Sequence, residues 1–260
     1  MIPRVCAASF LRLLRGRTKP CLMLCEDDEG NQHEAVVKLR AGFETKETGL
    51  VCEFLASLLA GDLGLPVPKP MIVEIEEGFD RAIPLPEVKA LVKKSAGLNF
   101  GSAKLPVGIN TWPKDKPIAM QLRPLAAEIF AFDAIVQNPD RRRDNPNLLW
   151  KGDDLYIFDH DLAFSFVAGV IGWKPPWTGQ RLEFLRNHVF YDGLKGTEIN
   201  LDRLTGALEA ISDRRLQEYI DDVPAEWTAK TDAAGQIVEY VREARRKGNK
   251  IVSAITRILQ

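Results

Sequence analysis

Three polar residues near the middle of the chain form a pattern that suits phosphate chemistry. Asp140 and Asn145 stand in one polar segment, and Asp159 follows after two short apolar runs. Carboxylate and amide oxygens are ligands that Mg²⁺ prefers, so Asn145 and Asp159 could hold this ion against phosphate oxygens. The second carboxylate, Asp140, could orient or deprotonate a hydroxyl nucleophile. Together these groups suit the transfer of a phosphoryl group to a hydroxyl.

Each of these acids taken alone is better explained as a turn or surface residue, because Asp and Asn are common in loops. The joint pattern of Asp, four residues, Asn, strand, turn, strand and Asp is far more specific. A different interpretation is a metal-dependent phosphohydrolase or transferase with a carboxylate cluster made of Asp153, Asp154, Asp159 and Asp161. Asp153 and Asp154 fall in the turn between the two apolar runs, far from Asp159, so this interpretation ranks last.

Local sequence signals predict how the polar residues are positioned. The predicted elements are a helix at 125–136, strands at 148–150 and 155–158, and a polar turn at 151–154. Asn138-Pro139 ends the helix just before Asp140. Two strands joined by a tight turn form a hairpin, and the outer ends of a hairpin lie side by side. The loop of Asp140 and Asn145 should therefore meet Asp159.

The rest of the chain predicts an α+β protein with two lobes. Strands are predicted at 4–14, 21–24, 35–39 and 71–75, and helices at 48–60, 181–188, 201–212, 214–219 and 235–259. We expect a β-rich N-lobe with one helix at 1–85, a crossover region at 86–118 and a mostly helical C-lobe with the hairpin at 119–260. The crossover itself should lie between Pro84 and Leu91.

The first lobe offers a loop that could face a phosphate group. Gly16, Arg17, Thr18 and Lys19 stand between two predicted strands, where backbone N–H groups, a hydroxyl and an amine could approach phosphate oxygens. The loop is neither the three-glycine loop of ordinary protein kinases nor a Walker A motif, so it is a weak signal by itself.

A lysine in the predicted strand at 35–39 has two explanations. Lys38 either faces solvent by strand alternation or binds nucleotide phosphates with the help of a helix carboxylate. Glu53 and Glu47 are the candidate carboxylates. Glu53 is the better partner, because its neighbours Cys52 and Phe54 place it beside the apolar stripe of the predicted helix.

Composition limits the classes of partner. The 260 residues carry 35 basic and 36 acidic side chains, for a net charge of −1, and 45% are hydrophobic. Such a chain can bury a substantial core, and its balanced charge argues against direct binding to nucleic acid. The basic cluster Arg141–Arg143 suits a phosphate group better than a duplex.

Targeting and redox signals are absent from the sequence. Several arginines interrupt the N-terminal apolar run, and the longest uncharged stretch is too short to span a bilayer. We therefore expect a cytoplasmic protein without membrane attachment. The cysteines lack the spacing of a zinc site and are expected to be buried, reduced thiols: Cys6, Cys21, Cys25 and Cys52.

These residues resemble a known family over nearly the whole chain, the HipA-like kinase domains, in their compact branch without the usual N-terminal extension. The resemblance rests on R-G-R-T-K-P at 15–20, V-V-K-L at 36–39, L-G-L-P-V-P at 63–68, G-L-N-F-G-S at 97–102, F-A-F-D-A-I-V-Q-N-P-D-R-x-x-x-N-P-N-L-L at 130–149 and I-F-D-H-D at 157–161. The last two motifs are the specific ones. They are also similar to the catalytic loop of phosphatidylinositol kinases, which share the atypical protein-kinase-like fold.

The resemblance implies an ATP- and Mg²⁺-dependent kinase that phosphorylates Ser or Thr on a protein. It implies Asp140 as the catalytic base and Asn145 and Asp159 as the Mg²⁺ ligands. It also implies Lys38 on the nucleotide phosphates with Glu53 as its partner, and residues 16–19 over the phosphates. HipA-type proteins are often toxins restrained by a DNA-binding antitoxin, so an antitoxin-like partner is a further expectation.

Two positions depart from the family pattern. Arg142 stands where related loops often carry His, and Asp161 stands where glycine is common. Asp161 is either a further metal ligand or a residue that stiffens the turn, and Asn147 could replace Asn145 as a ligand. The departures motivate an alternative, a nucleotide-binding pseudokinase that docks a partner. The three histidines are expected to be structural, with His160 bracing the metal loop through its backbone.

Overall fold

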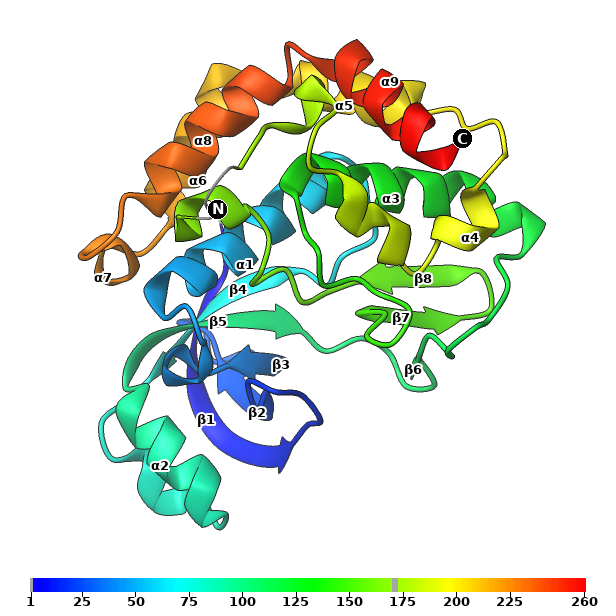
Figure 1. Ribbon diagram of the computed structural model, residues 1–260. Helices are drawn as coiled ribbons and strands as arrows, with labels where there is room; N and C mark the ends of the chain where they lie inside the picture. The colour runs from blue at the N-terminus through cyan, green and yellow to red at the C-terminus, as the bar shows by residue number, and fades with distance from the viewer. Residues whose placement is uncertain (1, 170–172) are drawn as a thin grey trace.

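The computed structural model describes residues 2–169 and 173–260, which form a β-barrel joined to a larger, mostly helical part (Figure 1). The barrel closes in the order β1-β2-β3-β5-β4, with β1 and β4 parallel and the other neighbours antiparallel. Its strands are β1 (Arg4–Leu13), β2 (Cys21–Glu26), β3 (Gln32–Lys38), β4 (Pro70–Ile75) and β5 (Gly97–Ala103). The strands predicted for the first lobe are therefore confirmed.

The barrel has an apolar interior because side chains alternate along its strands. Cys21, Met23 and Cys25 of β2 and Ala35 and Val37 of β3 are fully buried in it. Residues between these positions lie on the opposite face of the sheet. Lys38, which directly follows Val37, also lies on that face. The cysteines are all free thiols, and three of them are buried as expected, whereas the fourth, in β1, is exposed.

Helix α1 (Glu47–Asp62) lies between the barrel and the helical part (Figure 1). Every residue from 49 to 60 is buried. A helix that is apolar on all sides belongs in the interior of a protein. It contacts β4 and β5 of the barrel and also α7 (Ala225–Thr228) and α8 (Ala233–Ala244). Helix α1 therefore connects the packing of the two parts.

The barrel extends further along the chain than the sequence predicts. Helix α2 (Pro86–Lys94) packs Val88 and Val92 onto the barrel core, and β5 pairs with both β3 and β4. The crossover expected between Pro84 and Leu91 thus falls on a helix of the barrel part, and the chain leaves the barrel only after Ala103. Strand β5 is hard to predict because it contains two glycines, which have low strand propensity.

A second sheet carries the predicted hairpin. It has the order β6-β7-β8, formed by β6 (Asn110–Thr111), β7 (Leu148–Lys151) and β8 (Asp154–Ile157). Lys151 pairs with Asp154, which leaves a two-residue turn, and Gly152 in that turn has a φ of +59°. A left-handed glycine in such a turn matches the twist of the two strands. The hairpin prediction is confirmed.

The helical part surrounds the apolar helix α3. Its remaining helices are α3 (Arg123–Val136), α4 (Tyr191–Leu194), α5 (Asp202–Ala210), α6 (Asp213–Asp222) and α9 (Gly248–Leu259). Short 3-10 helices occur at η1 (Arg40–Gly42), η2 (Phe79–Ala82), η3 (Met120–Leu122), η4 (Ser165–Ala168), η5 (Pro176–Thr178) and η6 (Glu183–Asn187). Within the described ranges, no helix is both long and apolar enough to cross a bilayer.

Two predictions for the helical part need correction. The single helix expected at 235–259 is wrong, because α8 ends at Ala244 and α9 begins at Gly248. The backbone N–H of Lys247 donates to the carbonyl oxygen of Ala244 at 2.9 Å, which forms a turn between the helices. The helix expected at 181–188 is a short 3-10 helix. The two helices predicted at 201–212 and 214–219 are confirmed as α5 and α6.

Candidate active site

A lysine and two carboxylates from three distant elements form the centre of the candidate site. The Nζ of Lys38, at the end of β3, lies 2.8 Å from Oε2 of Glu53 and 2.5 Å from Oδ1 of Asp159. Lys38 and Glu53 are almost fully buried, whereas the side chain of Asp159 is 29% exposed. The sequence-based pairing of Lys38 with Glu53 is thus present in the structure, and Asp159 joins it.

The position of Glu53 is fixed by the fold around it. Glu53 lies within the buried segment of α1, and its Oε2 also accepts a hydrogen bond from the backbone N–H of His160 at 2.5 Å. A buried carboxylate is tolerated only when it is paired and hydrogen-bonded, and Glu53 has both kinds of partner. Burial raises the pKa of Glu53, and Lys38 opposes that change. The bond from His160 agrees with the expected bracing of this loop by its backbone.

A third carboxylate completes an acidic cluster at this centre. Oxygen atoms of Glu53, Asp159 and Asp161 all lie within 4.8 Å of one another. Burial and the neighbouring charge of Asp159 raise the pKa of Asp161 to about 6, although Lys38 opposes them. Burial also acts on Asp159, but there Lys38 prevails and lowers the pKa. One lysine does not balance three carboxylates, and the hard oxygen donors of the cluster fit a divalent cation such as Mg²⁺.

The loop after α3 presents Asp140 between two amides. The Nδ2 atoms of Asn145 and Asn147 donate hydrogen bonds to Oδ2 of Asp140, at 2.8 and 3.1 Å. Burial raises the pKa of Asp140, while the bond from Asn147 and the charge of Arg142 oppose this, and the charge of Asp159 adds to it. The two asparagines differ in access: Asn147 is buried and Asn145 is partly exposed.

The predicted basic cluster at 141–143 does not act as one group. Arg141 is 1% exposed, and its guanidinium donates to Oδ2 of Asp133 at 2.6 Å and to the carbonyl oxygen of Asn147. Arg142 is exposed and lies 3.5 Å from Asp140, whereas Arg143 pairs with Asp192. Arg141 is turned into the core, so of the three arginines only Arg142 and Arg143 are exposed.

Asp133 and Arg141 form a buried support that sequence reasoning missed. Asp133 lies in the apolar helix α3 and also bonds Nε2 of His188 at 3.0 Å. Burial would raise the pKa of Asp133, but Arg141 and His188 hold it at about 2. Because Arg141 also donates to the carbonyl oxygens of Asn147 and Phe158, this ion pair fixes both ends of the hairpin. An Asp inside the apolar run at 129–136 is the one sequence signal that indicates it.

The residues of the loop at 16–19 point in different directions. Thr18 is buried, and its carbonyl oxygen lies so close to Gly42 that a Cβ there would be 2.7 Å away. The Nζ of Lys19 pairs with Glu87 of α2 at 2.5 Å and is therefore turned toward the barrel helix. Arg17 pairs with Glu44. Burial raises the pKa of Asp140 and of Asp161, and the charge of Arg17 is one of the charges that oppose this rise, so Arg17 is the loop residue whose charge acts on the acidic centre.

The remaining predicted residues have structural surroundings. His160 is fully buried with no hydrogen-bond partner for its ring within the described residues, and burial lowers its pKa to about 3. His33 bonds Asp27 at 2.8 Å at the β2–β3 turn. Asp153 and Asp154 lie at the exposed turn of the hairpin and take no part in the acidic cluster. The carboxylate cluster proposed for a phosphohydrolase is therefore not assembled.

A family model of the HipA-like kinases matches residues 10–249. No curated protein matches the chain significantly. Among solved structures, the chain is similar to the Helicobacter pylori proinflammatory kinase CtkA, with a TM-score of 0.50 and 12% identity over 99% of this chain and 98% of that one. It is also similar to the Golgi casein kinase, with a TM-score of 0.45 and 11% identity over 99% and 72% of the two chains. The similarity to CtkA indicates a kinase fold. Because the family model spans most of its length, the chain belongs to the HipA-like kinase family.

Proposed function

We propose that the protein transfers the γ-phosphoryl group of ATP, with Mg²⁺, to the hydroxyl of a Ser or Thr residue in a protein substrate. One observation supports the proposal most strongly. The Nζ of Lys38 lies within 2.8 Å of carboxylate oxygens of both Glu53 and Asp159, beside the loop that presents Asp140. A lysine held by a helix carboxylate, together with a metal-binding aspartate and a loop aspartate, is the working set of a phosphotransferase.

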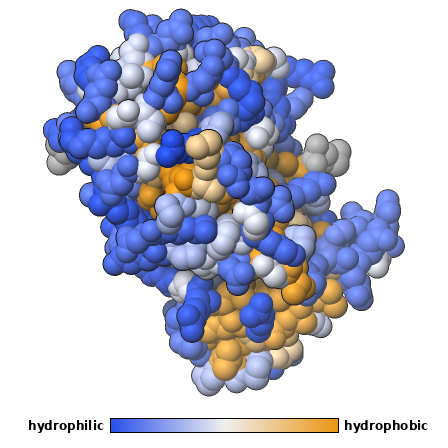
Figure 2. Space-filling model, turned by 90° about the vertical axis from the view of Figure 1, so that its right-hand side faces the viewer, coloured by the Kyte–Doolittle hydropathy of each residue, from blue (hydrophilic) through white to orange (hydrophobic). Residues whose placement is uncertain are grey.

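An apolar face beside Lys38 supports the binding of a nucleotide base. Val36 lies two residues before Lys38 and pairs with Leu22, so strand alternation places both on the face of the sheet that carries Lys38. Leu24, two residues after Leu22, follows on the same face. Figure 2 shows apolar surface low on the molecule, where Figure 1 places the barrel. We propose that the base of ATP packs against this face.

In the proposed reaction, the residues of the chain act mainly by positioning and by charge. Asp140 accepts the proton of the acceptor hydroxyl, and the amides of Asn145 and Asn147 hold its carboxylate in place. Lys38 binds nucleotide phosphates and is kept in position by Glu53. Arg17 adds positive charge from the loop at 16–19.

The donor set fits a metal ion carried by the nucleotide. Asn145 and Asp159 would hold it, with Asp161 beside them as a third oxygen donor. Bound Mg²⁺ neutralises the charge of the phosphate oxygens. Asn145 is a better ligand than Asn147, because Asn145 is partly exposed whereas Asn147 is buried.

The test compares wild type with Asp159→Asn and Asp140→Ala. We expect ATP with Mg²⁺ to raise the melting temperature of the wild type, since a ligand at 100 times its Kd stabilises by about 2.7 kcal/mol. Asp159→Asn should lose the Mg²⁺-dependent part of this shift. Asp140→Ala should keep the shift and lose phosphoryl transfer, measured with labelled ATP, by a factor of about 10² or more.

The alternative of a pseudokinase rests on Arg142 and Asp161, which depart from the family pattern. It predicts a thermal shift with ATP but no transfer in the wild type. Transfer that disappears in Asp140→Ala contradicts it, whereas an unchanged rate in Asp140→Ala contradicts the kinase proposal.

We further propose that the protein acts in the cytoplasm and is restrained by an antitoxin-like protein, as its family membership suggests. Pull-down from its native host, with Asp140→Ala as bait, tests this.

A further inference from the structure

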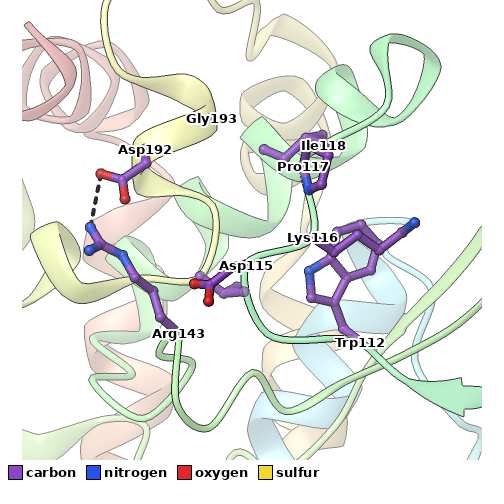
Figure 3. A pocket seen from close by; sticks show the side chains of 9 residues that line it. Trp112, Asp115, Lys116, Pro117, Ile118, Arg143, Asp192 and Gly193 are labelled. Carbon is purple, nitrogen blue, oxygen red and sulfur yellow. Dashed lines mark hydrogen bonds and ion pairs between the residues drawn. The ribbon is translucent and has the colours of Figure 1, made fainter.

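A pocket of about 310 Å³ lies beside the loop of Asp140 and has no part in the nucleotide site described above (Figure 3). Its walls come from the segment after β6, from the end of the Asp140 loop and from α4. An apolar side is formed by Trp112, Ile118 and Val189, and a charged side by Asp115, Arg143 and Asp192. A mixed pocket of this size suits one amphipathic side chain with an apolar stem and a charged head.

The pocket is close to the proposed base. Arg143 stands three residues after Asp140, and three residues of chain span at most about 11 Å. Backbone hydrogen bonds fix the wall to the loop: Val189 N–H donates to the carbonyl oxygen of Arg141 at 3.1 Å, and Arg143 N–H donates to that of Asn187 at 3.3 Å. A peptide whose hydroxyl reaches Asp140 would therefore place a residue two to four positions away in the pocket.

The apolar wall is rigidly packed. Trp112 is 3% exposed and contacts the rings of Trp150 and Phe190 edge-on, with centroids 5.7 Å away in both cases. A Cβ on Gly193 would lie 2.6 Å from Cδ1 of Ile118, so α4 approaches this wall as closely as a glycine allows. The pocket is preformed and can bind a side chain without ordering its own wall.

The two cations near the pocket are already engaged. Arg143 donates to Oδ1 of Asp192 at 2.9 Å and to the carbonyl oxygen of Arg186 at 3.1 Å. The Nζ of Lys116 lies over the ring of Trp150, 4.0 Å from its centroid. Figure 3 shows the Lys116 amine directed away from Asp115 and from the Arg143–Asp192 pair.

The pocket therefore has a carboxylate to offer. Asp115 is exposed, and within the described residues its side chain forms no ion pair or hydrogen bond. Asp192 is 67% exposed and has only Arg143 as its partner. The charged residues that line the pocket are two acids and two bases, but Arg143 is paired with Asp192 and the amine of Lys116 lies over the ring of Trp150. The carboxylate of Asp115 is therefore the group that can pair with a cationic head group.

We propose that this pocket binds a Lys or Arg side chain of the acceptor protein, two to four residues from the phosphorylated Ser or Thr. Its aliphatic stem packs on the half-buried Ile118 and Val189, and its cation pairs with Asp115. The inference rests on the proposed kinase function and adds to it a preference for basic substrates, with Asp115 as the residue that sets the preference.

The test uses peptides with one Ser in an Ala- and Gly-based sequence. Arg, Ala or Glu is placed at each position two to four residues on either side, and KM and kcat are measured for wild type, Asp115→Asn and Asp115→Lys. We expect a lower KM for one Arg peptide in the wild type. Asp115→Asn should raise that KM about three- to fivefold, as for an exposed ion pair, with little change in kcat. Asp115→Lys should reverse the preference toward the Glu peptide.

Asp28→Asn is the matched control, because Asp28 is an exposed acid in the β2–β3 turn, and it should behave as the wild type. A wild-type preference for Glu peptides, no preference, or an Arg preference that survives Asp115→Asn overturns the inference while the kinase proposal stands.

Binding measured without transfer separates the two proposals. Fluorescence anisotropy is recorded with labelled peptides in which Ala replaces Ser. Arg-dependent binding that Asp115→Lys abolishes supports the pocket even if the wild type transfers no phosphate, in which case only the kinase proposal fails. Equal binding of Arg and Glu peptides overturns the pocket.

Discussion

The charges of the candidate site are held by two buried ion pairs with different tasks. Lys38 is shared between Glu53 and Asp159 and faces the acidic centre, whereas Arg141 and Asp133 lie behind it in the core. The first pair has a partly exposed member and can exchange partners when a ligand binds. The second pair has fully buried side chains and holds backbone carbonyls of the hairpin. The first is thus suited to binding and the second to support.

Asp133→Asn tests the support role and its dependence on pH. The folded pKa of Asp133, at about 2, is below its ordinary value of 3.8, so its charge stabilises the fold above pH 3.8. This contribution, on the order of 2 kcal/mol, is lost as the pH falls through 2. Removing the charge leaves Arg141 buried without its partner, and we expect a loss of about 3–5 kcal/mol at pH 7 by urea unfolding.

Comparison across pH separates this effect from a general loss of packing. Between pH 5 and pH 2.5, stability should fall less steeply in Asp133→Asn than in the wild type, because the variant has no carboxylate to protonate at this position. Asp202→Asn, at an exposed position of α5, is the control and should keep the wild-type slope. Equal slopes in Asp133→Asn and the wild type would refute the assigned pKa.

At the scale of elements, α1 carries the packing between the barrel and the helical part. Leu55 is completely buried in it, beside the segment that carries Glu53. We expect Leu55→Ala to destabilise the protein by about 2–5 kcal/mol, because the substitution leaves a cavity that the packed side chains around it cannot fill. Leu11→Ala, at a position 45% exposed in β1, should cost much less. Urea unfolding measures both, and similar losses would show that α1 is not central to the packing.

Elements with strong local signals could be predicted from the sequence. The hairpin around Gly152 and the end of α3 at Asn138-Pro139 depend on turn residues whose conformational preferences are intrinsic. In contrast, β5 is a strand only because β3 and β4 pair with both of its edges, and its glycines hide it from a propensity argument.

The candidate site divides in the same way. The motif residues Asp140, Asn145 and Asp159 could be found by their spacing. Lys38 and Glu53 could be found by their places in a predicted strand and a predicted helix. The Asp133–Arg141 pair could not be predicted, because in the sequence Arg141 belongs to a run of three arginines that is expected to be exposed, whereas in the structure it is buried. The direction of Lys19 toward α2 could not be predicted either, because its partner Glu87 is 68 residues away in sequence.

At the scale of the whole molecule, a polar contact joins α7 to the barrel beside α1. Glu226 accepts from Arg40 at 2.7 Å and from the backbone N–H of Leu98 at 3.0 Å, and Trp227 donates to the carbonyl oxygen of Leu98 at 2.9 Å. These bonds connect α7 of the helical part to β5 of the barrel. They should limit the relative motion of the two parts around the site.

Glu226→Ala tests this tie. We expect a loss of about 0.5–1.5 kcal/mol, because the exposed amide of Leu98 exchanges its carboxylate acceptor for water. Hydrogen exchange of the Leu98 amide should become faster, while amides in the middle of α3 keep their rates. Glu239→Ala, at a side chain 71% exposed, is the control. Unchanged exchange at Leu98 would show that the contact does not restrain β5.

The contacts that assemble the acidic centre join residues that are far apart in the sequence, and this affects when the centre forms during synthesis. Lys38 and Asp159 are 121 residues apart, and Glu53 meets the backbone of His160 across 107 residues. Contacts of such high sequence separation bear a loop-closure entropy cost and form late in folding. Synthesis proceeds from the N-terminus, so the barrel strands, complete by Ala103, are available well before the hairpin. A nascent chain that ends before residue 161 therefore lacks the acidic centre, and the proposed activity is confined to chains that extend beyond this residue.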